Sequence, residues 1–522
     1  MKHSKKLASL LLALVMALSL AVTAFAAETY SITINNSAEG HTYEAYQIFT
    51  GDLHEVTTGE GEAATTTKVL SNIVWGSGVS EAGQVALGDA AAKAETLTTE
   101  ADAKAFAKAV APYLTTAAGS ASTVTDGKYV ISGLAAGYYL VKDQDGSLIG
   151  DNDSYTEYII QVVGNVTATP KSDVPEVQKK VKDINDSTDT TKTDWQDSAD
   201  YDIGDSIPFQ LKATLADNVS SYTTYKVVFH DTLSKGLTYN KDAKVYIDGT
   251  ETNGFTVTAT VNADGTTTLT VSCDDVKALG AGNSSVITVE YTAKLNENAV
   301  LGSAGNPNEV YLEYSNNPNK SEEGNNETGE TPKDVVIVFT YKTIINKVDS
   351  ETKPLTGAAF KLEKLIKGED GAADTWTTVK EFAVDGTTTS FTFSGLDDGQ
   401  YKLTETKTPV GYNTIDPIYF VIEATHGETA DVPTLKTLNA YLTDANGNKQ
   451  TEMKDGESVN IDLGTVDLTA GSITTTVVNK SGSELPSTGG IGTTIFYVLG
   501  GVLVLAAVVL LVTKKRMSGA EK

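Results

Sequence analysis

The chain has very little cysteine and histidine for its length. Its 522 residues include a single cysteine, Cys273, so no disulfide can form within one chain. There are five histidines, and none lies in an HExxH motif or pairs with a cysteine in a nucleophile context. GxSxG elbows and phosphate-binding glycine loops are also missing. These absences argue against an enzyme, and we expect no cofactor and no metal site.

Positive charge is also scarce. Lysine and arginine total 40 against 68 aspartates and glutamates, which gives a net charge of -28. This balance disfavours binding to nucleic acids or to anionic membranes, and it keeps a protein soluble.

The two ends of the chain indicate export. Lys2, Lys5 and Lys6 precede an apolar run from Leu7 to Val22 and an A-x-A cleavage site at 24–26, so residues 1–26 are expected to be a signal peptide. An exported protein without disulfides needs another staple or very well packed cores. We therefore expect Cys273 to be a small buried strand residue without a role.

The C-terminus carries three features in order. An apolar run over 491–512 is long enough to cross a bilayer, and basic residues at 514–516 follow it. Before the run comes a short motif: Leu485, Pro486, Ser487, Thr488 and Gly489. Residues 484–522 resemble the LPXTG sorting signal of Gram-positive surface proteins, although a simple membrane anchor is an alternative. The resemblance implies that a sortase thiol attacks the Thr488–Gly489 bond and that an amine then resolves the acyl-enzyme.

Most of the remaining sequence has a β pattern. Short runs rich in Val, Ile, Thr, Tyr and Phe alternate with polar residues and end at Gly, Asn and Asp turns, as at 266–272 and 285–295. The alanine-rich stretch Glu81 to Leu114 has helical spacing instead, and we expect a helical insertion there. Linker composition predicts three domains, at 27–169, 170–332 and 333–480.

An internal repeat links the first domain to the third. Its matched segments are 33–36 with 344–347, 43–48 with 357–362, and 133–139 with 395–401. The shared pattern resembles the collagen-adhesin B-type immunoglobulin-like domain. The resemblance implies an all-β fold of three tandem immunoglobulin-like β-sandwiches, followed by a transmembrane sorting helix.

With the sorting signal, the layout looks like a Gram-positive backbone (major) pilin. Such a subunit is polymerised by a pilus-specific class C sortase and anchored to peptidoglycan by a housekeeping sortase. The resemblance implies further partners, namely a peptidoglycan precursor, identical subunits, minor pilins and host surface ligands. The alternative function is a monomeric wall-anchored adhesin, which would not need a lysine that receives the next subunit.

The resemblance also implies internal Lys–Asn isopeptide bonds, each assisted by a buried acid. In the third domain, strand alternation puts Lys347 in phase with Ile345, Glu405 with Leu403, and Asn479 with Val477. These residues match the family's reactive lysine, acid and C-terminal asparagine. We assign Lys347 as nucleophile, Glu405 as catalytic acid and Asn479 as electrophile.

The middle domain offers a second set. Lys179 is in phase with Val177 and Val181, Asp231 with Phe229, and Asn308 with Val310. The same three positions match the family pattern, as nucleophile, acid and electrophile respectively. Lys180 is the alternative nucleophile if a bulge shifts the strand by one residue.

The first domain departs from the pattern. Asn36 stands where the third domain has Lys347, although Asp143 keeps the position of Glu405. Without the amine no isopeptide bond can form, so we expect this domain to be unlocked and the least stable.

The amine that would join subunits is expected at the first domain boundary. The family's YPKN-like motif is reduced here to Pro170 and Lys171, with Thr169 in place of the aromatic residue and Ser172 in place of asparagine. We assign Lys171 as the polymerisation lysine, and an ordinary linker lysine is the alternative.

Overall fold

The structure is a computed structural model, and it describes residues 28–58, 65–148, 152–170, 173–322, 324 and 326–482. It divides into two compact units. The first unit holds the segments up to 184, 191–340 and 425–436, and the second holds 185–190, 341–424 and the segments from 437 onward. Among the residues described here, no helix is long and apolar enough to cross a membrane.

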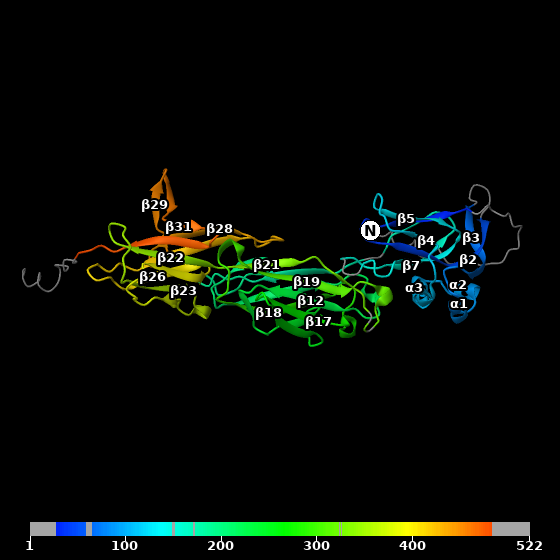
Figure 1. The fold of residues 1–522 in the computed structure, drawn as a ribbon, viewed down its shortest axis with the longest axis horizontal. Coiled ribbons are helices and arrows are strands. Elements are labelled where there is room, and N and C mark those ends of the chain that lie inside the picture. Colours follow the sequence, from blue (N-terminus) through cyan, green and yellow to red (C-terminus); the bar gives the residue numbers. More distant parts are fainter. Residues whose placement is uncertain are drawn as a thin grey trace, which may run out of the picture. The chain divides into compact units, whose positions relative to one another are not determined.

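The N-terminal part of the first unit has two sheets (Figure 1). In the smaller sheet the order is β5 (Lys128–Leu134), β1 (Tyr30–Asn35) and β8 (Val166–Ala168). The larger sheet has the order β3 (Thr65–Trp75), β2 (Tyr43–Thr58), β6 (Gly137–Asp143) and β7 (Glu157–Val162), and β4 (Gly119–Ala121) pairs with β2. Alternate residues Tyr30, Ile32 and Ile34 are buried, as a half-buried strand requires.

The expected helical insertion forms three short helices. They are α1 (Glu81–Leu87), α2 (Ala90–Glu95) and α3 (Glu100–Val110). Each helix starts at a side-chain cap, from Ser80, Asp89 and Thr99 respectively, and Thr99 forms a capping box with Asp102. Phe106 of α3 stacks on Phe49 of β2 at 5.5 Å, which packs the insertion onto the larger sheet. The prediction of helix between residues 81 and 114 is confirmed.

The middle part of the first unit is a sandwich of two larger sheets. One has the order β10 (Ser198–Asp200), β21 (Asp334–Phe339), β19 (Asn306–Ser315), β12 (Val227–Leu233), β17 (Thr267–Cys273) and β16 (Thr256–Val261), with β20 (Thr328–Glu330) on β19. The other has the order β15 (Thr250–Thr252), β14 (Lys244–Ile247), β18 (Val286–Leu295), β11 (Ser206–Thr214) and β9 (Glu176–Val181), with β13 (Leu237–Tyr239) on β18. Inward-facing residues of both sheets form one apolar core, and Cys273 is a buried strand residue at its edge.

Strand pairing bears on the expected boundary at residues 332 and 333. Strand β21 begins after that boundary, yet it pairs antiparallel with β19 of the middle sandwich. The first compact unit likewise continues to Thr340. The composition of the linker therefore placed the boundary too early, because the polar stretch 316–332 lies inside the middle sandwich and not after it.

The second unit has two main sheets. One has the order β25 (Ser390–Leu396), β22 (Tyr341–Val348), β32 (Ser472–Val478) and β31 (Thr465–Asp467). The other has the order β24 (Thr375–Glu381), β23 (Ala359–Ile366), β26 (Gly399–Lys407), β27 (Ile418–His426) and β28 (Leu435–Thr443). The end of β27 and the start of β28 fall within Thr425–Lys436, which belongs to the first unit. A separate hairpin joins β29 (Thr451–Lys454) to β30 (Glu457–Asn460). Short 3₁₀ turns complete the two units: η2 (Ala111–Tyr113), η3 (Val219–Ser221), η4 (Val276–Leu279), η5 (Gly302–Ala304), η6 (Pro318–Lys320) and η7 (Glu369–Gly371).

The internal repeat has the same strand pairing in both copies. Ile34 of β1 lies opposite Tyr129 of β5 and, in parallel, opposite Ala168 of β8. Its counterpart Ile345 of β22 lies opposite Phe391 of β25 and, in parallel, opposite Thr475 of β32. Asn36 and Lys347 therefore occupy equivalent places, two residues further along.

Candidate functional site

Strand β9 carries a completely buried lysine. Lys179 pairs with Leu211 of β11 and has no exposed surface, while Val181 beside it on the same face is also buried. Its Nζ atom lies over the rings of Phe209 and Tyr291, 5.6 and 5.5 Å from their centres. Such a site is hostile to a lone ammonium, so the polar partners of Lys179 decide what the amine can do.

Three polar side chains meet the Lys179 amine. Nζ donates to Asp231 Oδ1 at 2.5 Å and to the hydroxyl oxygen of Tyr291 at 3.2 Å. The Tyr291 hydroxyl donates to Asp231 Oδ2 at 2.5 Å, and it accepts from Asn308 Nδ2 at 2.8 Å. The side-chain oxygen of Asn308 is buried and has no hydrogen-bond partner. The structure thus brings the three residues chosen from the sequence into one cluster.

Burial acts on both ionisable partners in the direction that favours their neutral forms. Lys179 and Asp231 are both fully buried. Burial lowers the pKa of the Lys179 amine and raises the pKa of the Asp231 carboxyl group. A neutral amine beside a protonated carboxyl group is the state that amide chemistry needs.

Tyr291 belongs to this cluster, whereas Lys180 does not. Tyr291 was missed in the sequence, although its position on the buried face of the alternating strand β18 could have suggested it. Lys180 points away from the cluster and forms an ion pair with Asp197. No bulge shifts β9, so the pairing favours Lys179 over the alternative.

The third domain buries its own lysine between its first and last strands. Lys347 of β22 has no exposed surface and lies opposite Val477 of the parallel strand β32. Its Nζ donates to the backbone carbonyls of Val477 at 2.9 Å and Val348 at 3.3 Å. Burial lowers the pKa of Lys347 to about 8, against the opposing effect of the Glu405 charge.

Asn479 follows β32 directly and contacts the third residue of this set. Its Nδ2 donates to Glu405 Oε2 at 3.0 Å and to the Asn413 carbonyl at 2.8 Å, while its backbone N–H donates to the Val348 carbonyl at 3.1 Å. The Oδ1 atom of Asn479 and the Oε1 atom of Glu405 are buried without hydrogen-bond partners. Lys347 and Asn479 therefore both contact Val348, although their side chains do not hydrogen-bond to each other.

In the first domain a histidine occupies the corresponding region. Asn36 donates to the Tyr43 hydroxyl at 2.8 Å, and His41 lies between two carboxylates. His41 Nδ1 is 2.7 Å from Asp143 Oδ1, and its Nε2 is 2.8 Å from Asp153 Oδ2. Burial alone would lower the pKa of His41, but the two carboxylates raise it to about 9. Asp143, the equivalent of Glu405, is thus held by a charged histidine, and no motif in the sequence predicts this contact.

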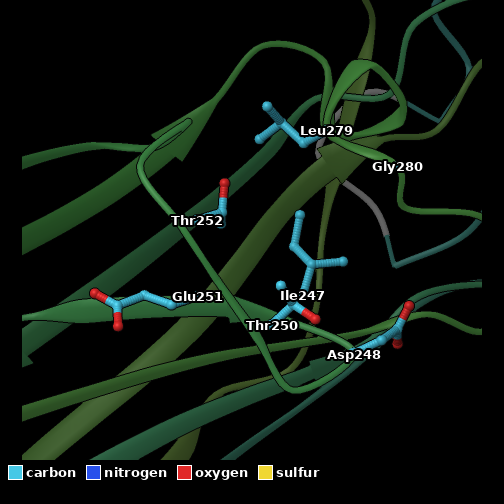
Figure 2. Close-up of a pocket in the computed structure, with 7 residues that line it drawn as sticks. All are labelled: Ile247, Asp248, Thr250, Glu251, Thr252, Leu279 and Gly280. Atoms are coloured by element: carbon cyan, nitrogen blue, oxygen red, sulfur yellow. The ribbon is translucent and has the colours of Figure 1, made fainter.

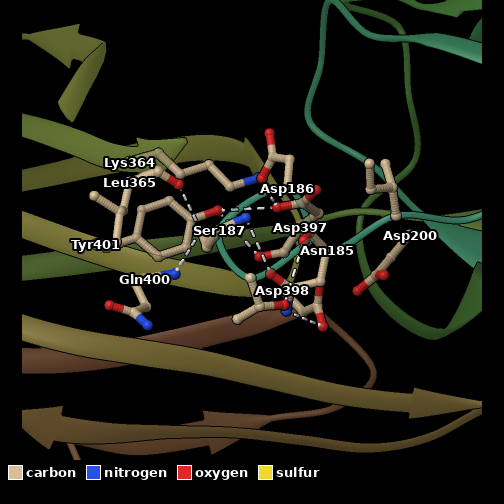
Figure 3. Close-up of polar contacts among 12 residues, drawn as sticks. Asn185, Asp186, Ser187, Asp200, Lys364, Leu365, Asp397, Asp398, Gln400 and Tyr401 are labelled. Atoms are coloured by element: carbon tan, nitrogen blue, oxygen red, sulfur yellow. Dashed lines mark hydrogen bonds and ion pairs between the residues drawn. The ribbon is translucent and has the colours of Figure 1, made fainter. Parts of the chain in front are cut away.

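A buried ion pair in the second unit was also unexpected (Figure 3). Lys364 of β23 forms an ion pair with Asp397, and Asp186 Oδ1 lies 2.6 Å from the same amine. Nearby, Ser187 Oγ donates to the Leu365 carbonyl at 2.7 Å and accepts from the Gln400 N–H at 2.9 Å. These contacts hold the segment Asn185–Thr190 against β23 and β26 of its own unit.

A shallow hollow in the middle sandwich shows no catalytic arrangement. It lies between β14, β15 and η4, where Asp248, Glu251 and Leu279 contribute to its lining (Figure 2). Asp248 accepts from Ser285 Oγ and from the Val286 N–H, so its carboxylate is used in a turn. The hollow is therefore not a candidate site.

Several predicted features lie outside the described residues. They are the signal peptide, the polymerisation lysine Lys171, the sorting motif at 485–489 and the apolar run at 491–512.

Three family models match the chain in sequence order. Residues 203–318 match the Gram-positive pilin backbone subunit 2, Cna-B-like domain, and residues 342–437 match the prealbumin-like fold domain. Residues 477–518 match the LPXTG cell wall anchor motif. The first match covers the part of the middle sandwich from β11 to β19, with Asp231 and Asn308 but without Lys179, and the second covers Lys347 and Glu405.

Known relatives agree with these matches. The Trypsin-resistant surface T6 protein of Streptococcus pyogenes serotype M6 is 26% identical over 450 residues, which is 75% of this chain and 77% of that protein. The solved T6 backbone pilin of the same serotype has a TM-score of 0.54 at 19% identity and covers 88% of this chain and 100% of its own. The structural likeness supports the fold, and the sequence matches support the family. The chain thus combines a Cna-B-like pilin-backbone domain, a prealbumin-like fold domain and an LPXTG cell wall anchor motif, and these matches support a cell-wall-anchored surface pilus protein.

Proposed function

We propose that this backbone pilin is joined to its neighbours by a class C sortase, from Thr488 of one subunit to Lys171 of the next. We further propose that Lys–Asn isopeptide bonds lock two of its three domains. The divisions would fall near residue 170 and after Thr340, where β21 ends the middle sandwich. The modular three-domain structure named for the T6 backbone pilin agrees with this division.

The meeting of Lys179, Asp231 and Asn308 carries the proposal. In the proposed reaction, the neutral Lys179 amine attacks the side-chain amide carbon of Asn308. The protonated Asp231 carboxyl group donates to Asn308 Oδ1, the buried oxygen that has no other partner. Asp231 then takes a proton from the attacking nitrogen and passes it to the leaving nitrogen, and it recovers its own proton from Oδ1 as the carbonyl group re-forms. One C–N bond forms, one C–N bond breaks, and ammonia leaves.

The same reaction would join Lys347 to Asn479 with Glu405 as the acid. The lowered pKa of Lys347 supports a neutral amine, and the hydrogen bond of 3.0 Å that Asn479 Nδ2 donates to Glu405 Oε2 supports Glu405 as the acid for this amide. Asp143 lacks a lysine partner in the first domain, so we propose that this domain is held by its His41 ion pairs and contains no such bond.

Intact mass of the mature chain tests the bonds directly. Two bonds would lower the mass by two molecules of ammonia. Asp231→Asn should restore one of them, because the buried proton donor for the middle domain is lost. Asp242→Asn, at a carboxylate that accepts from Thr292 outside the cluster, is the matched control and should not change the bond count. An unmodified wild-type mass would overturn the proposal for both domains.

A further inference from the structure

A second histidine–carboxylate cluster lies elsewhere in the first unit. It consists of Asp183 after β9, Asp200 at the end of β10 and His426 at the end of β27, and one ligand atom from each lies within 4.8 Å of the others. All three residues belong to the first compact unit. We propose that these side chains bind a divalent transition-metal ion of the zinc type, as a structural site independent of the isopeptide chemistry.

The spacing of the cluster suits a metal better than a hydrogen bond. His426 Nε2 is 3.4 Å from Asp183 Oδ2 and 3.8 Å from Asp200 Oδ1. Hydrogen bonds between nitrogen and oxygen are normally about 2.7–3.2 Å long. Ligand atoms at about 2.0–2.2 Å from a tetrahedral zinc ion are about 3.3–3.6 Å apart. The separation of 3.4 Å lies within this range and that of 3.8 Å lies just above it, so both are wide enough for an ion between the ligand atoms.

Other histidines of the chain give an internal comparison. His41 reaches its two carboxylates at 2.7 and 2.8 Å, and His230 reaches Glu313 at 3.0 Å. These are ordinary charged hydrogen bonds. His426 is the exception, because it faces two carboxylates and closes on neither of them.

A buried oxygen atom of Asp200 is a second observation that supports a bound metal ion. Asp200 is 2% exposed, and its Oδ2 atom is buried without a hydrogen-bond partner. An unpaired buried carboxylate oxygen is costly. Two carboxylates with a neutral imidazole carry a charge of about −2, which one divalent cation would balance.

Ser198 orients the imidazole for this role. Its Oγ lies 2.7 Å from His426 Nδ1, on the opposite side of the ring from the two carboxylates. If Nδ1 carries the proton and donates to Ser198, Nε2 is left with the lone pair that a metal needs. One imidazole and two carboxylates form a ligand set that zinc accepts, with a fourth position open to water. Calcium is less suitable because it prefers oxygen ligands alone.

An ion here would tie together distant parts of the chain. Ser198 and His426 are 228 residues apart in sequence, and the segment 425–436 would be attached to the strand ends near residues 183 and 200. A bound ion of this kind stabilises the folded state, and the stabilisation grows with the logarithm of the free ion concentration once that concentration exceeds the dissociation constant.

Zinc titration of the mature chain, followed by calorimetry and thermal unfolding, tests this site. We expect one tight Zn²⁺ per chain and a higher melting temperature that EDTA reverses. Asp200→Asn and His426→Gln should each weaken binding by more than about tenfold. His230→Gln is the matched control, because His230 pairs with Glu313 outside the cluster, and it should bind zinc like the wild type.

The absorption of bound Co²⁺, measured together with circular dichroism, separates loss of the metal site from loss of the fold. Co²⁺ added to the wild type should give the intense visible bands of a four-coordinate site, and Asp183→Asn should lose them while keeping its circular dichroism. Zinc binding that is equal in the wild type and in Asp200→Asn would overturn the proposal. In that case His426 would be a protonated side chain between two carboxylates, with no metal ion. Stabilisation by Ca²⁺ but not by Zn²⁺ would overturn it as well.

Discussion

Lys179 and Lys347 are lysines with no exposed surface, and each faces the core of its sandwich. Removing an ammonium from water costs several kcal/mol unless it is well paired. Lys179 has one carboxylate partner in a site lined by Phe209 and Tyr291, and Lys347 has backbone carbonyls. Conversion of each amine to a neutral amide would remove the charge and its cost permanently. This is the physical reason for placing an amide-forming reaction at these two positions.

The Tyr291 hydroxyl group is expected to speed formation of the proposed middle-domain bond. This hydroxyl contacts Lys179, Asp231 and Asn308, so it would position all three for the proposed reaction. We predict that Tyr291→Phe slows formation of the middle-domain bond while leaving the third-domain bond unaffected. Mass spectra taken at intervals after synthesis would show the delay.

The matched control for this variant is Tyr239→Phe, which removes a hydroxyl that donates to none of the reacting residues and accepts from the Ala243 N–H. A middle-domain bond that forms equally fast in Tyr291→Phe and in the wild type would show that the hydroxyl has no positioning role.

His41 makes the stability of the first domain depend on pH. Its pKa is about 9 in the folded chain against about 6.5 when unfolded, which corresponds to about 3 kcal/mol. Because the folded pKa is raised, this stabilisation is fully present below about pH 6.5 and is lost as pH rises towards 9. We predict that the first thermal transition of the mature chain falls to lower temperature over this pH range.

The control separates His41 from general charge effects. His41→Ala should lower the first transition at pH 6 and flatten its dependence between pH 6.5 and 9. His54→Ala on β2 should leave that dependence as it is in the wild type, because no carboxylate in the described part of the chain forms an ion pair with His54. A wild-type transition that does not change between pH 6.5 and 9 would contradict the assignment.

At the scale of strands and sheets, a covalent bond would make the paired strands β22 and β32 harder to separate under force. These are the first and last strands of the third domain, and they lie side by side in parallel from Lys342 opposite Ser472 to Val348 opposite Val478. Force applied to the two ends of this domain would act along both strands. A bond from Lys347 to Asn479 would join them where β32 ends.

Removal of this bond should weaken the third domain. A cross-link that closes a loop on the order of 100 residues stabilises a fold by about 4–5 kcal/mol in the chain-entropy account. We predict a loss of about this size in Lys347→Ala, together with faster cleavage by trypsin within residues 341–478. Denaturant unfolding with protease digestion would measure both effects.

Lys342→Ala is the control for Lys347→Ala, because Lys342 lies on the same strand but is not fully buried. If the two variants unfold alike, the third domain is not held by Lys347.

Strand alternation predicted that Lys179, Asp231 and Asn308 are buried, and the reason is physical. A period of two residues fixes which side chains face the core, so Lys179 could be separated from Lys180 before any coordinates were known. Alternation acts within one strand and gives no information on which strands meet. For that reason alternation did not predict that Tyr291 of β18 joins the cluster, nor that His41 of the loop between β1 and β2 contacts Asp143.

At the scale of the whole chain, composition and terminal motifs predicted an exported, wall-anchored pilin, and the matches to pilin and LPXTG anchor models support this prediction. Composition was less reliable for boundaries, because a polar insertion inside a sandwich resembles a linker. The contacts of Asp183, Asp200 and His426 were also beyond prediction, since they depend on segments that are distant in sequence.

Covalent polymerisation through Lys171 is the central claim at this scale, and a denaturing gel of wall material released by muramidase tests it most directly. Antibody to this chain should detect a ladder of high-mass species that survives boiling in detergent. Lys171→Ala should abolish the ladder and leave wall-attached monomer, while Lys353→Ala, at an exposed lysine, should retain it. A single monomer-sized band from the wild type, or a full ladder from Lys171→Ala, would contradict the account.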